Sequence, residues 1–187
     1  ALADGRMNDF LDAFGEPQKP VLRPFRMAVM VGAPGSGKTS LFDALLRIYR
    51  REYSGTGDVR ILDPNNNWPG DPDAFWPVDG DASTWLESWK AQRMRERMPR
   101  PALLGLDDAD RYLTGSPPTG IFRDLFTSFR HWRTDVLVNA RRPQDIPKVV
   151  LASSETGYIF RQREVYGRAY LAKMLGQEIL PKIPTEP

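Results

Sequence analysis

The stretch Gly32–Thr39, with the sequence Gly-Ala-Pro-Gly-Ser-Gly-Lys-Thr, constrains this chain more than any other. It matches the phosphate-loop pattern G-x-x-x-x-G-K-[ST] at every fixed position. A short apolar run at 27–31 precedes it, and apolar residues recur at helical spacing over 41–49 after it. A strand, a glycine-rich loop and a helix in this order are the setting in which backbone N–H groups bind phosphate. The stretch therefore predicts a nucleoside triphosphate site between a buried strand and a helix.

The side chains of this loop have distinct expected roles. Lys38 is expected to reach the β- and γ-phosphates, and the Thr39 hydroxyl is expected to bind Mg²⁺. A guanine-reading Asn-Lys-x-Asp motif is absent, which favours ATP as the nucleotide. The predicted nucleotide-binding residues are Gly32, Ala33, Pro34, Gly35, Ser36, Gly37, Lys38, Thr39 and Ser40.

Composition limits the classes of protein that remain. The chain has no cysteine and one histidine, which excludes disulfides, thiolate metal sites and a His-based metal centre. With 26 Lys and Arg against 24 Asp and Glu, binding to nucleic acid would need clustered positive charge. No apolar run approaches about 18 residues and no signal peptide is recognisable, so we expect a cytoplasmic protein without a membrane span. We expect an N-terminal arm over 1–24 and one domain over 25–187.

A second chemical feature follows the apolar run 102–106, which ends in Asp107 and Asp108. A buried strand that ends in two carboxylates, about 70 residues after a phosphate loop, is the Walker B arrangement. We expect Asp107 to organise Mg²⁺ and its water, and Asp108 to accept a proton from the attacking water.

Strand and helix patterns alternate along the rest of the chain, which predicts an α/β fold with a mostly parallel sheet covered on both faces. A loop is expected over 69–81, and a helix from near Thr84, where Glu87 gives capping-box spacing. That helix runs into the most basic stretch of the chain, which either forms a solvated helix face or touches nucleic-acid phosphates through Arg93, Arg95, Arg97 and Arg100. Further strands are expected at 59–62, 135–140 and 158–161, and helices at 121–132 and 164–176.

In this order, the motifs resemble the HerA/FtsK superfamily of ring-forming, DNA-pumping ATPases. The resemblance rests on the phosphate loop, Asp63-Pro64-Asn65 after a strand, Asp107-Asp108, and Phe129-Arg130-His131 before the strand that ends at Arg141-Arg142-Pro143. It covers about residues 26–180, and the compact size is more similar to the viral genome-packaging branch. The resemblance implies a P-loop NTPase fold of the RecA/ASCE-like class.

The resemblance also implies roles for two arginines. Arg130 corresponds to an arginine finger for the neighbouring subunit's nucleotide, and Arg141 corresponds to a polar sensor that is commonly Gln. Asp108 stands where the superfamily usually has Glu. Independently of the resemblance, Asn139, Arg141 and Arg142 follow a strand at its carboxyl end, where a nucleotide sensor would lie.

The implied function is a Mg²⁺-dependent ATP hydrolase that forms a homo-oligomeric ring, expected to be hexameric, and moves double-stranded DNA into a viral capsid. A capsid or portal-vertex protein would be a further partner, in the host cytoplasm or at the virion vertex. Two alternatives remain open from the residues. One is a small-molecule P-loop kinase, in which Arg141 and Arg142 serve a lid, and the other is a nucleotide-dependent assembly or switch protein that translocates nothing.

Overall fold

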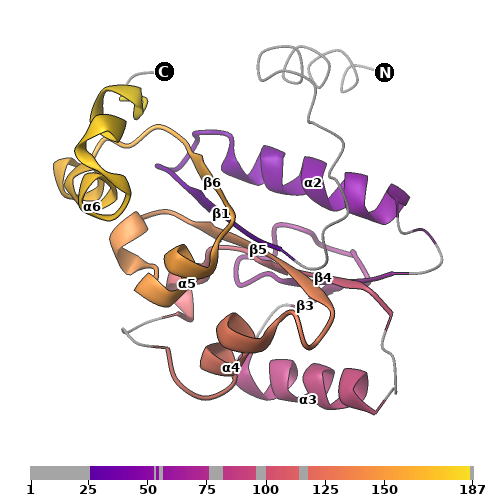
Figure 1. Cartoon of the computed structure of the whole chain (residues 1–187). Helices are drawn as coiled ribbons and strands as arrows, with labels where there is room; N and C mark the ends of the chain where they lie inside the picture. Colours follow the sequence, from indigo (N-terminus) through magenta and orange to yellow (C-terminus); the bar gives the residue numbers. More distant parts are fainter. Residues whose placement is uncertain are drawn as a thin grey trace, which may run out of the picture.

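A single parallel sheet organises the residues that the computed structural model describes, which are 26–52, 54, 57–75, 82–95, 100–113 and 118–185. Within these ranges six strands pair in the order β3-β2-β4-β5-β1-β6, and every pair is parallel. The predicted α/β class with a mostly parallel sheet is therefore confirmed (Figure 1). The strands are β1 (Met27–Val31), β2 (Asp58–Leu62), β3 (Ala74–Phe75), β4 (Ala102–Leu106), β5 (Thr134–Ala140) and β6 (Thr156–Ile159).

Helices cover both faces of this sheet, as Figure 1 shows. Helix α2 (Lys38–Glu52) lies on one face, and α3 (Ala82–Met94), α4 (Gly120–Ser128) and α5 (Lys148–Ser153) lie on the other. Helix α6 (Val165–Leu175) follows β6 and packs against the short helix η3 (Pro143–Asp145). The remaining short helices are η2 (Ala109–Arg111) and η4 (Gln177–Lys182). No helix of the described part of the chain is long and apolar enough to cross a membrane.

Among the described residues, the hydrophobic core consists of two clusters, one on each face of the sheet. Under α2, the fully buried Phe42 and Leu46 pack on strand residues that include Ile61. The ring of Phe42 lies so close to β4 that a Cβ at Gly105 would be 2.6 Å from its Cζ atom, which explains a glycine inside a buried strand.

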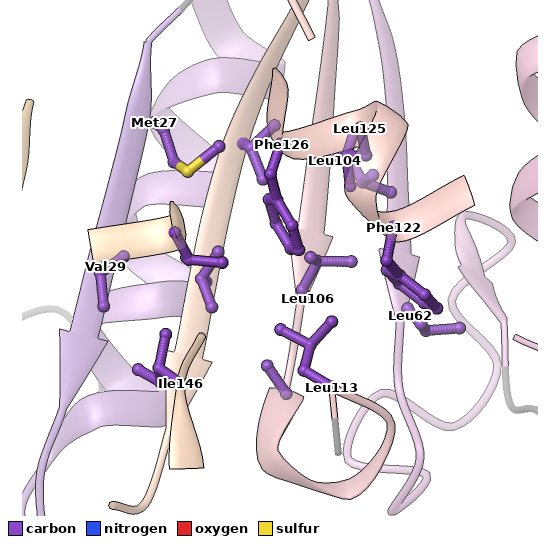
Figure 2. Packing of buried hydrophobic residues seen from close by; sticks show 14 of the residues in the cluster. Met27, Val29, Leu62, Leu104, Leu106, Leu113, Phe122, Leu125, Phe126 and Ile146 are labelled. Atoms are coloured by element: carbon purple, nitrogen blue, oxygen red, sulfur yellow. The ribbon is translucent and has the colours of Figure 1, made fainter. Parts of the chain in front are cut away.

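On the other face, α4 supplies much of the apolar contact. Figure 2 shows Phe122, Leu125 and Phe126 of α4 directed toward the strand residues Leu104 and Leu106. These residues recur at helical spacing, so the pattern that predicted a helix also predicted the face that packs on the sheet.

Several predicted boundaries are wrong by a few residues. Helix α3 begins at Ala82 rather than near Thr84, and the segment expected to be only a loop contributes the edge strand β3. The last strand is Thr156–Ile159, because the ladder to β1 starts opposite Ala28. The short α5 was not predicted, and its six residues are too few to show a helical period.

The predicted helix over 121–132 ends at Ser128, so Arg130 lies in the turn that follows α4 and not on the helix. Backbone bonds from Trp132 N to Phe129 O (3.1 Å) and from Thr134 N to Phe129 O (3.1 Å) close this turn before β5. The predicted arm over 1–24 lies outside the described residues.

Candidate nucleotide-binding site

The sheet order brings the predicted motifs together. Strand β5 lies between β1 and β4, with Val31 of β1 opposite Ala140 and Leu106 of β4 opposite Val138. Because parallel strands end at the same edge of a sheet, the phosphate loop, Asp107 and Asn139 meet there. The geometry therefore forms one polar site from three strand ends.

The phosphate loop is shaped by the segment that follows β6. Gly35 and Gly37 have φ values of 72° and 93°, a backbone conformation that glycine adopts without strain. Ala33 N donates to Arg161 O (2.9 Å), and a Cβ on Gly32 would lie 2.5 Å from Phe160 Cβ. The loop backbone therefore packs directly against Phe160 on one side, and its other side faces the site.

Ser36 and Lys38 in this loop have polar atoms suited to an anion. Lys38 is buried, and its Nζ donates to Ala33 O (3.1 Å) within its own loop. Burial lowers the pKa of Lys38, while the carboxylates of Asp108, Asp107 and Asp110 act in the opposite direction. The buried Oγ of Ser36 has no hydrogen-bond partner in the described part of the chain. A bound phosphate would supply the missing partner, which fits the predicted site.

Asp107 is held by two side-chain amides, one from β5 and one from the turn that follows β2. Its side chain is buried, Asn139 Nδ2 donates to Oδ1 (2.5 Å), and Asn67 Nδ2 donates to Oδ2 (2.7 Å). Burial raises the pKa of Asp107 to about 6, further raised by Asp108 and Asp63, although the two amide bonds lower it. A buried carboxylate that forms no ion pair among the described residues fits a site that binds Mg²⁺ or its water shell. Thr39, the other predicted Mg²⁺ ligand, is exposed in the first turn of α2.

Asp108 is oriented by the turn after β2. Its backbone is left-handed (φ 39°), and Asn65 Nδ2 donates to its Oδ2 atom. Arg111 in turn donates to Asn65 Oδ1, while Asp63 accepts the N–H of Asn65 (3.3 Å) and fixes the turn. The sequence analysis assigned no role to Asn65 or Asn67. The Asp63-Pro64-Asn65 end of the strand was the available signal that side chains of this turn face the two carboxylates.

Asn139 and Arg141 occupy different places at the end of β5. Asn139 is buried against Asp107, and its Oδ1 atom has no partner within the described ranges. Arg141, the predicted sensor, is bound to Asp110 through Nε (2.9 Å) and Nη2 (2.6 Å). Its neighbour Arg142 pairs with Glu164 (3.1 Å). A cavity of about 480 Å³ beside the loop is lined by Ala33, Pro34, Asp110, Arg141, Arg142, Asp145, Gln162, Arg163 and Glu164.

Arg130 does not belong to this cluster. It precedes β5, whereas the phosphate loop lies beyond the opposite ends of the strands. Arg130 Nη2 binds Glu155 (2.7 Å), which also pairs with Arg26 Nε (3.3 Å) just before β1. The length of β5 therefore separates Arg130 from the phosphate loop of its own chain.

The basic stretch is not a uniform surface. Arg93 is buried and donates to Trp132 O (3.0 Å) and Arg100 O, so its guanidinium holds the fold together and is not available to nucleic acid. The expectation that Arg93 touches phosphates is thereby corrected, because three carbonyls and Asp58 surround it. Arg95 and Arg100 are exposed, and Arg97 lies outside the described residues.

Searches with protein-family models and against curated proteins return no match. Solved structures with a similar fold include the DNA-packaging ATPase B204 from Sulfolobus Turreted Icosahedral Virus, with a TM-score of 0.72, 15% identity, and coverage of 86% of this chain and 87% of that one. The genome packaging NTPase B204 from Sulfolobus turreted icosahedral virus 2, in complex with AMPPCP, gives a TM-score of 0.70 at 16% identity, covering 89% and 90%. Its complex with ATP-gammaS gives 0.69 at 16% identity, covering 89% of each chain.

At such identities the likeness concerns the fold. The predicted P-loop NTPase fold is confirmed, because these viral packaging NTPases share it over most of the chain.

Proposed function

We propose that this chain is a Mg²⁺-dependent ATPase that works as a ring motor on double-stranded DNA, as in viral genome packaging. The observation that carries the ATPase part is the junction of a phosphate loop with a buried Asp107 that two amides hold in place. The fold that surrounds this junction is shared with packaging NTPases whose structures contain AMPPCP or ATP-gammaS.

The residues of the site divide the proposed chemistry between them. The loop N–H groups and Lys38 bind and orient the phosphates, and Thr39 and Asp107 would hold Mg²⁺, which neutralises charge on the transferring phosphoryl group. Asp108 accepts the proton of the attacking water, and Asn65 keeps its carboxylate oriented. The Oδ1 atom of Asn139, which has no hydrogen-bond partner among the described residues, would accept a hydrogen bond from that water.

The ring is proposed from the position of Arg130. Arg130 lies at the amino ends of the strands, away from the phosphate loop of its own chain, and this position supports a role at the site of a neighbouring copy. We propose Arg130 as the finger of a homo-oligomeric ring, expected to be hexameric. Arg95 and Arg100 are the exposed cations of the basic stretch that we propose for contact with DNA, and a capsid or portal-vertex protein remains a proposed partner.

Steady-state ATP hydrolysis with and without long duplex DNA tests this function, together with a mass measurement in the presence of nucleotide. We expect turnover that DNA stimulates, and a closed oligomer. Lys38→Ala should abolish turnover while the circular dichroism spectrum stays that of the wild type, because within the described residues the hydrogen bond of Nζ goes to its own loop. Turnover of Lys38→Ala within a few-fold of the wild type would contradict the site.

The same assay separates the alternatives. Phosphoryl transfer from ATP to a metabolite, without DNA stimulation, would identify a kinase. Nucleotide binding with an altered mass but negligible turnover would identify an assembly or switch protein.

A further inference from the structure

Asp110 lies at the wall of the cavity beside the phosphate loop, and its carboxylate is almost completely enclosed. The side chain is 6% exposed, whereas that of its partner Arg141 is 46% exposed. Oδ2 accepts two bonds from the guanidinium, and Oδ1 accepts the backbone N–H of Arg141 (3.3 Å). Three contacts to a single residue fix where the Arg141 side chain leaves the end of β5.

The pairing leaves one edge of the guanidinium free. Asp110 takes Nε and one proton of Nη2, and within the described residues Nη1 of Arg141 makes no hydrogen bond. An arginine has five N–H donors arranged as a planar fork, so the Nη1 edge can still bind an anion. Asp110 therefore anchors Arg141 and leaves donors for a ligand.

Arg141 lies next to the phosphate loop. Arg141 lines the same cavity of about 480 Å³ as Ala33 and Pro34 of the loop. Arg141 also helps to lower the pKa of Lys38, behind burial as the main cause, so the two cations lie within electrostatic reach of each other. An anion that extends from Lys38 toward the cavity would meet both.

We propose that Asp110 is a positioning residue that holds Arg141 ready to bind the terminal phosphate, so that the site distinguishes a nucleoside triphosphate from a diphosphate. The inference rests on the proposed ATP site. It adds Asp110, a residue that would not itself contact the nucleotide. A guanidinium held in place before binding loses less freedom when the phosphate arrives, and the gain is expected to be about three- to tenfold in affinity. A diphosphate does not extend to Arg141, so its affinity should not depend on Asp110.

The test is equilibrium binding of Mg²⁺–AMPPCP and of Mg²⁺–ADP to the full chain. We expect the wild type to prefer AMPPCP. Asp110→Asn should weaken AMPPCP about three- to tenfold and change ADP by less than about twofold. Arg141→Ala should weaken AMPPCP by about tenfold or more. The double variant should bind like Arg141→Ala alone, because Asp110 acts through that arginine.

Asp145→Asn is the matched control. Asp145 lines the same cavity and acts on Arg141 through its charge, but its carboxylate has no hydrogen bond or ion pair among the described residues, so this change removes the same charge without releasing Arg141. We expect it to weaken neither nucleotide. If Asp110→Asn does not fold, Asp110→Glu makes the same comparison, since it keeps the charge but moves the carboxylate by one methylene group and so displaces the guanidinium of Arg141.

Two kinds of result would overturn the inference. If Asp110→Asn tightens AMPPCP, leaves it unchanged, or weakens AMPPCP and ADP equally, Asp110 does not position Arg141 for the terminal phosphate, although the ATP site stands. If the wild type binds neither nucleotide, the proposed function itself fails, and the inference fails with it.

Discussion

Gly32 leaves no room for a side chain where β1 passes into the phosphate loop. A Cβ there would lie 2.5 Å from Phe160 Cβ and 2.9 Å from Ser36 Oγ, both closer than real contacts allow. Gly32→Ala should therefore displace the loop, lower the free energy of unfolding by about 1–3 kcal/mol and weaken nucleotide binding. Urea denaturation and AMPPCP titration measure the two effects.

Gly157→Ala is the control for this change. Gly157 lies in β6, and among the described residues no atom beyond its chain neighbours lies within 4 Å of the position that an added methyl group would take. We therefore expect a change in the free energy of unfolding below about 0.5 kcal/mol. Equal behaviour of the two variants would show that the close approach at Gly32 is not a real constraint.

At single residues, the sequence was informative where the signal is local. Lys38, Thr39 and Asp107 could be assigned because their chemistry is tied to spacing within one motif. The bonds from Asn67 and Asn139 to Asp107 could not, because they depend on which strands are neighbours in the sheet. Arg93 was misjudged for the same reason, since the carbonyls that bury it come from 39 or 40 residues further along the chain.

Helix α3 is tied to the turn before β5 by one arginine. Arg93 is 5% exposed, donates to the carbonyls of Trp132 and Arg133, and lies 3.7 Å from Asp58. Arg93→Ala would leave buried acceptors unsatisfied, so we expect the free energy of unfolding to fall by about 2–4 kcal/mol. Denaturant titration measures this loss.

Arg95, two residues further along the chain, is exposed and provides the contrast. Arg95→Ala should leave stability unchanged. If Arg95 contacts DNA, its removal should lower the slope of log affinity against log salt by about 0.9. A stable Arg93→Ala variant, or an unaltered salt slope for Arg95→Ala, would contradict the assignment of the corresponding residue.

Asp135, the second residue of β5, has a side chain whose ionised form is disfavoured by burial. Burial raises the pKa of Asp135 to about 6, although the Arg26 N–H that it accepts at 2.6 Å lowers it. Because the folded pKa lies above the unfolded value, the protein loses stability as pH rises from about 4 to above 6, by at most about 3 kcal/mol. Asp135→Asn keeps an oxygen acceptor and removes the charge.

We therefore expect Asp135→Asn to be about 1–3 kcal/mol more stable than the wild type at about pH 8 and nearly equal to it at about pH 4. Thermal unfolding across this range tests the expectation. A difference that is the same at both pH values would show that ionisation of Asp135 does not affect stability.

The elements that the sequence predicted best are those with a sustained period. The stripe of α4 identified both the helix and its buried face, while the two residues of β3 and the six of α5 are too short to carry a period. The end of α4 was missed because its apolar pattern continues through Phe129 and Trp132, which are buried in the turn rather than in the helix.

For the whole molecule, the decisive experiment mixes two inactive proteins. Arg130→Ala should still bind ATP but turn it over about 10³-fold more slowly, because a finger acts on charge that develops in the transition state. Subunits with Arg130→Ala keep an intact phosphate loop, and subunits with Lys38→Ala keep the finger. In mixed rings we expect ATPase activity to recover, since some junctions join an intact loop to an intact finger.

The mass of the mixed rings is the control, because the ATPase measurement tests the finger only in rings that contain both Arg130→Ala and Lys38→Ala subunits. Rings that are shown to be mixed and remain inactive would contradict a finger that acts between subunits. Wild-type turnover by Arg130→Ala alone would assign Arg130 to contacts within its own chain, such as the ion pair with Glu155, rather than to a neighbour's site.

The overall class of the fold followed from the alternation of apolar runs and helical stripes, which requires a parallel sheet with crossover helices. The order of the strands did not follow from it. The position of β5 between β1 and β4 depends on how all the helices pack on the two faces of the sheet. Because of this position, Asn139 rather than Arg141 forms a hydrogen bond with Asp107.

The seven residues of β5 also set a distance. At about 3.3 Å per residue the strand spans roughly 20 Å from the turn that holds Arg130 to the edge that holds the phosphate loop. In the proposed ring, a subunit would bind one nucleotide at one end of this strand and contact its neighbour's at the other. At an effective dielectric constant of about 20, two unit charges roughly 20 Å apart interact by less than about 1 kcal/mol, so the charge of one nucleotide would act only weakly on the next. Consecutive hydrolysis events would then be coordinated by the rigid displacement of β5 and the layers packed on it.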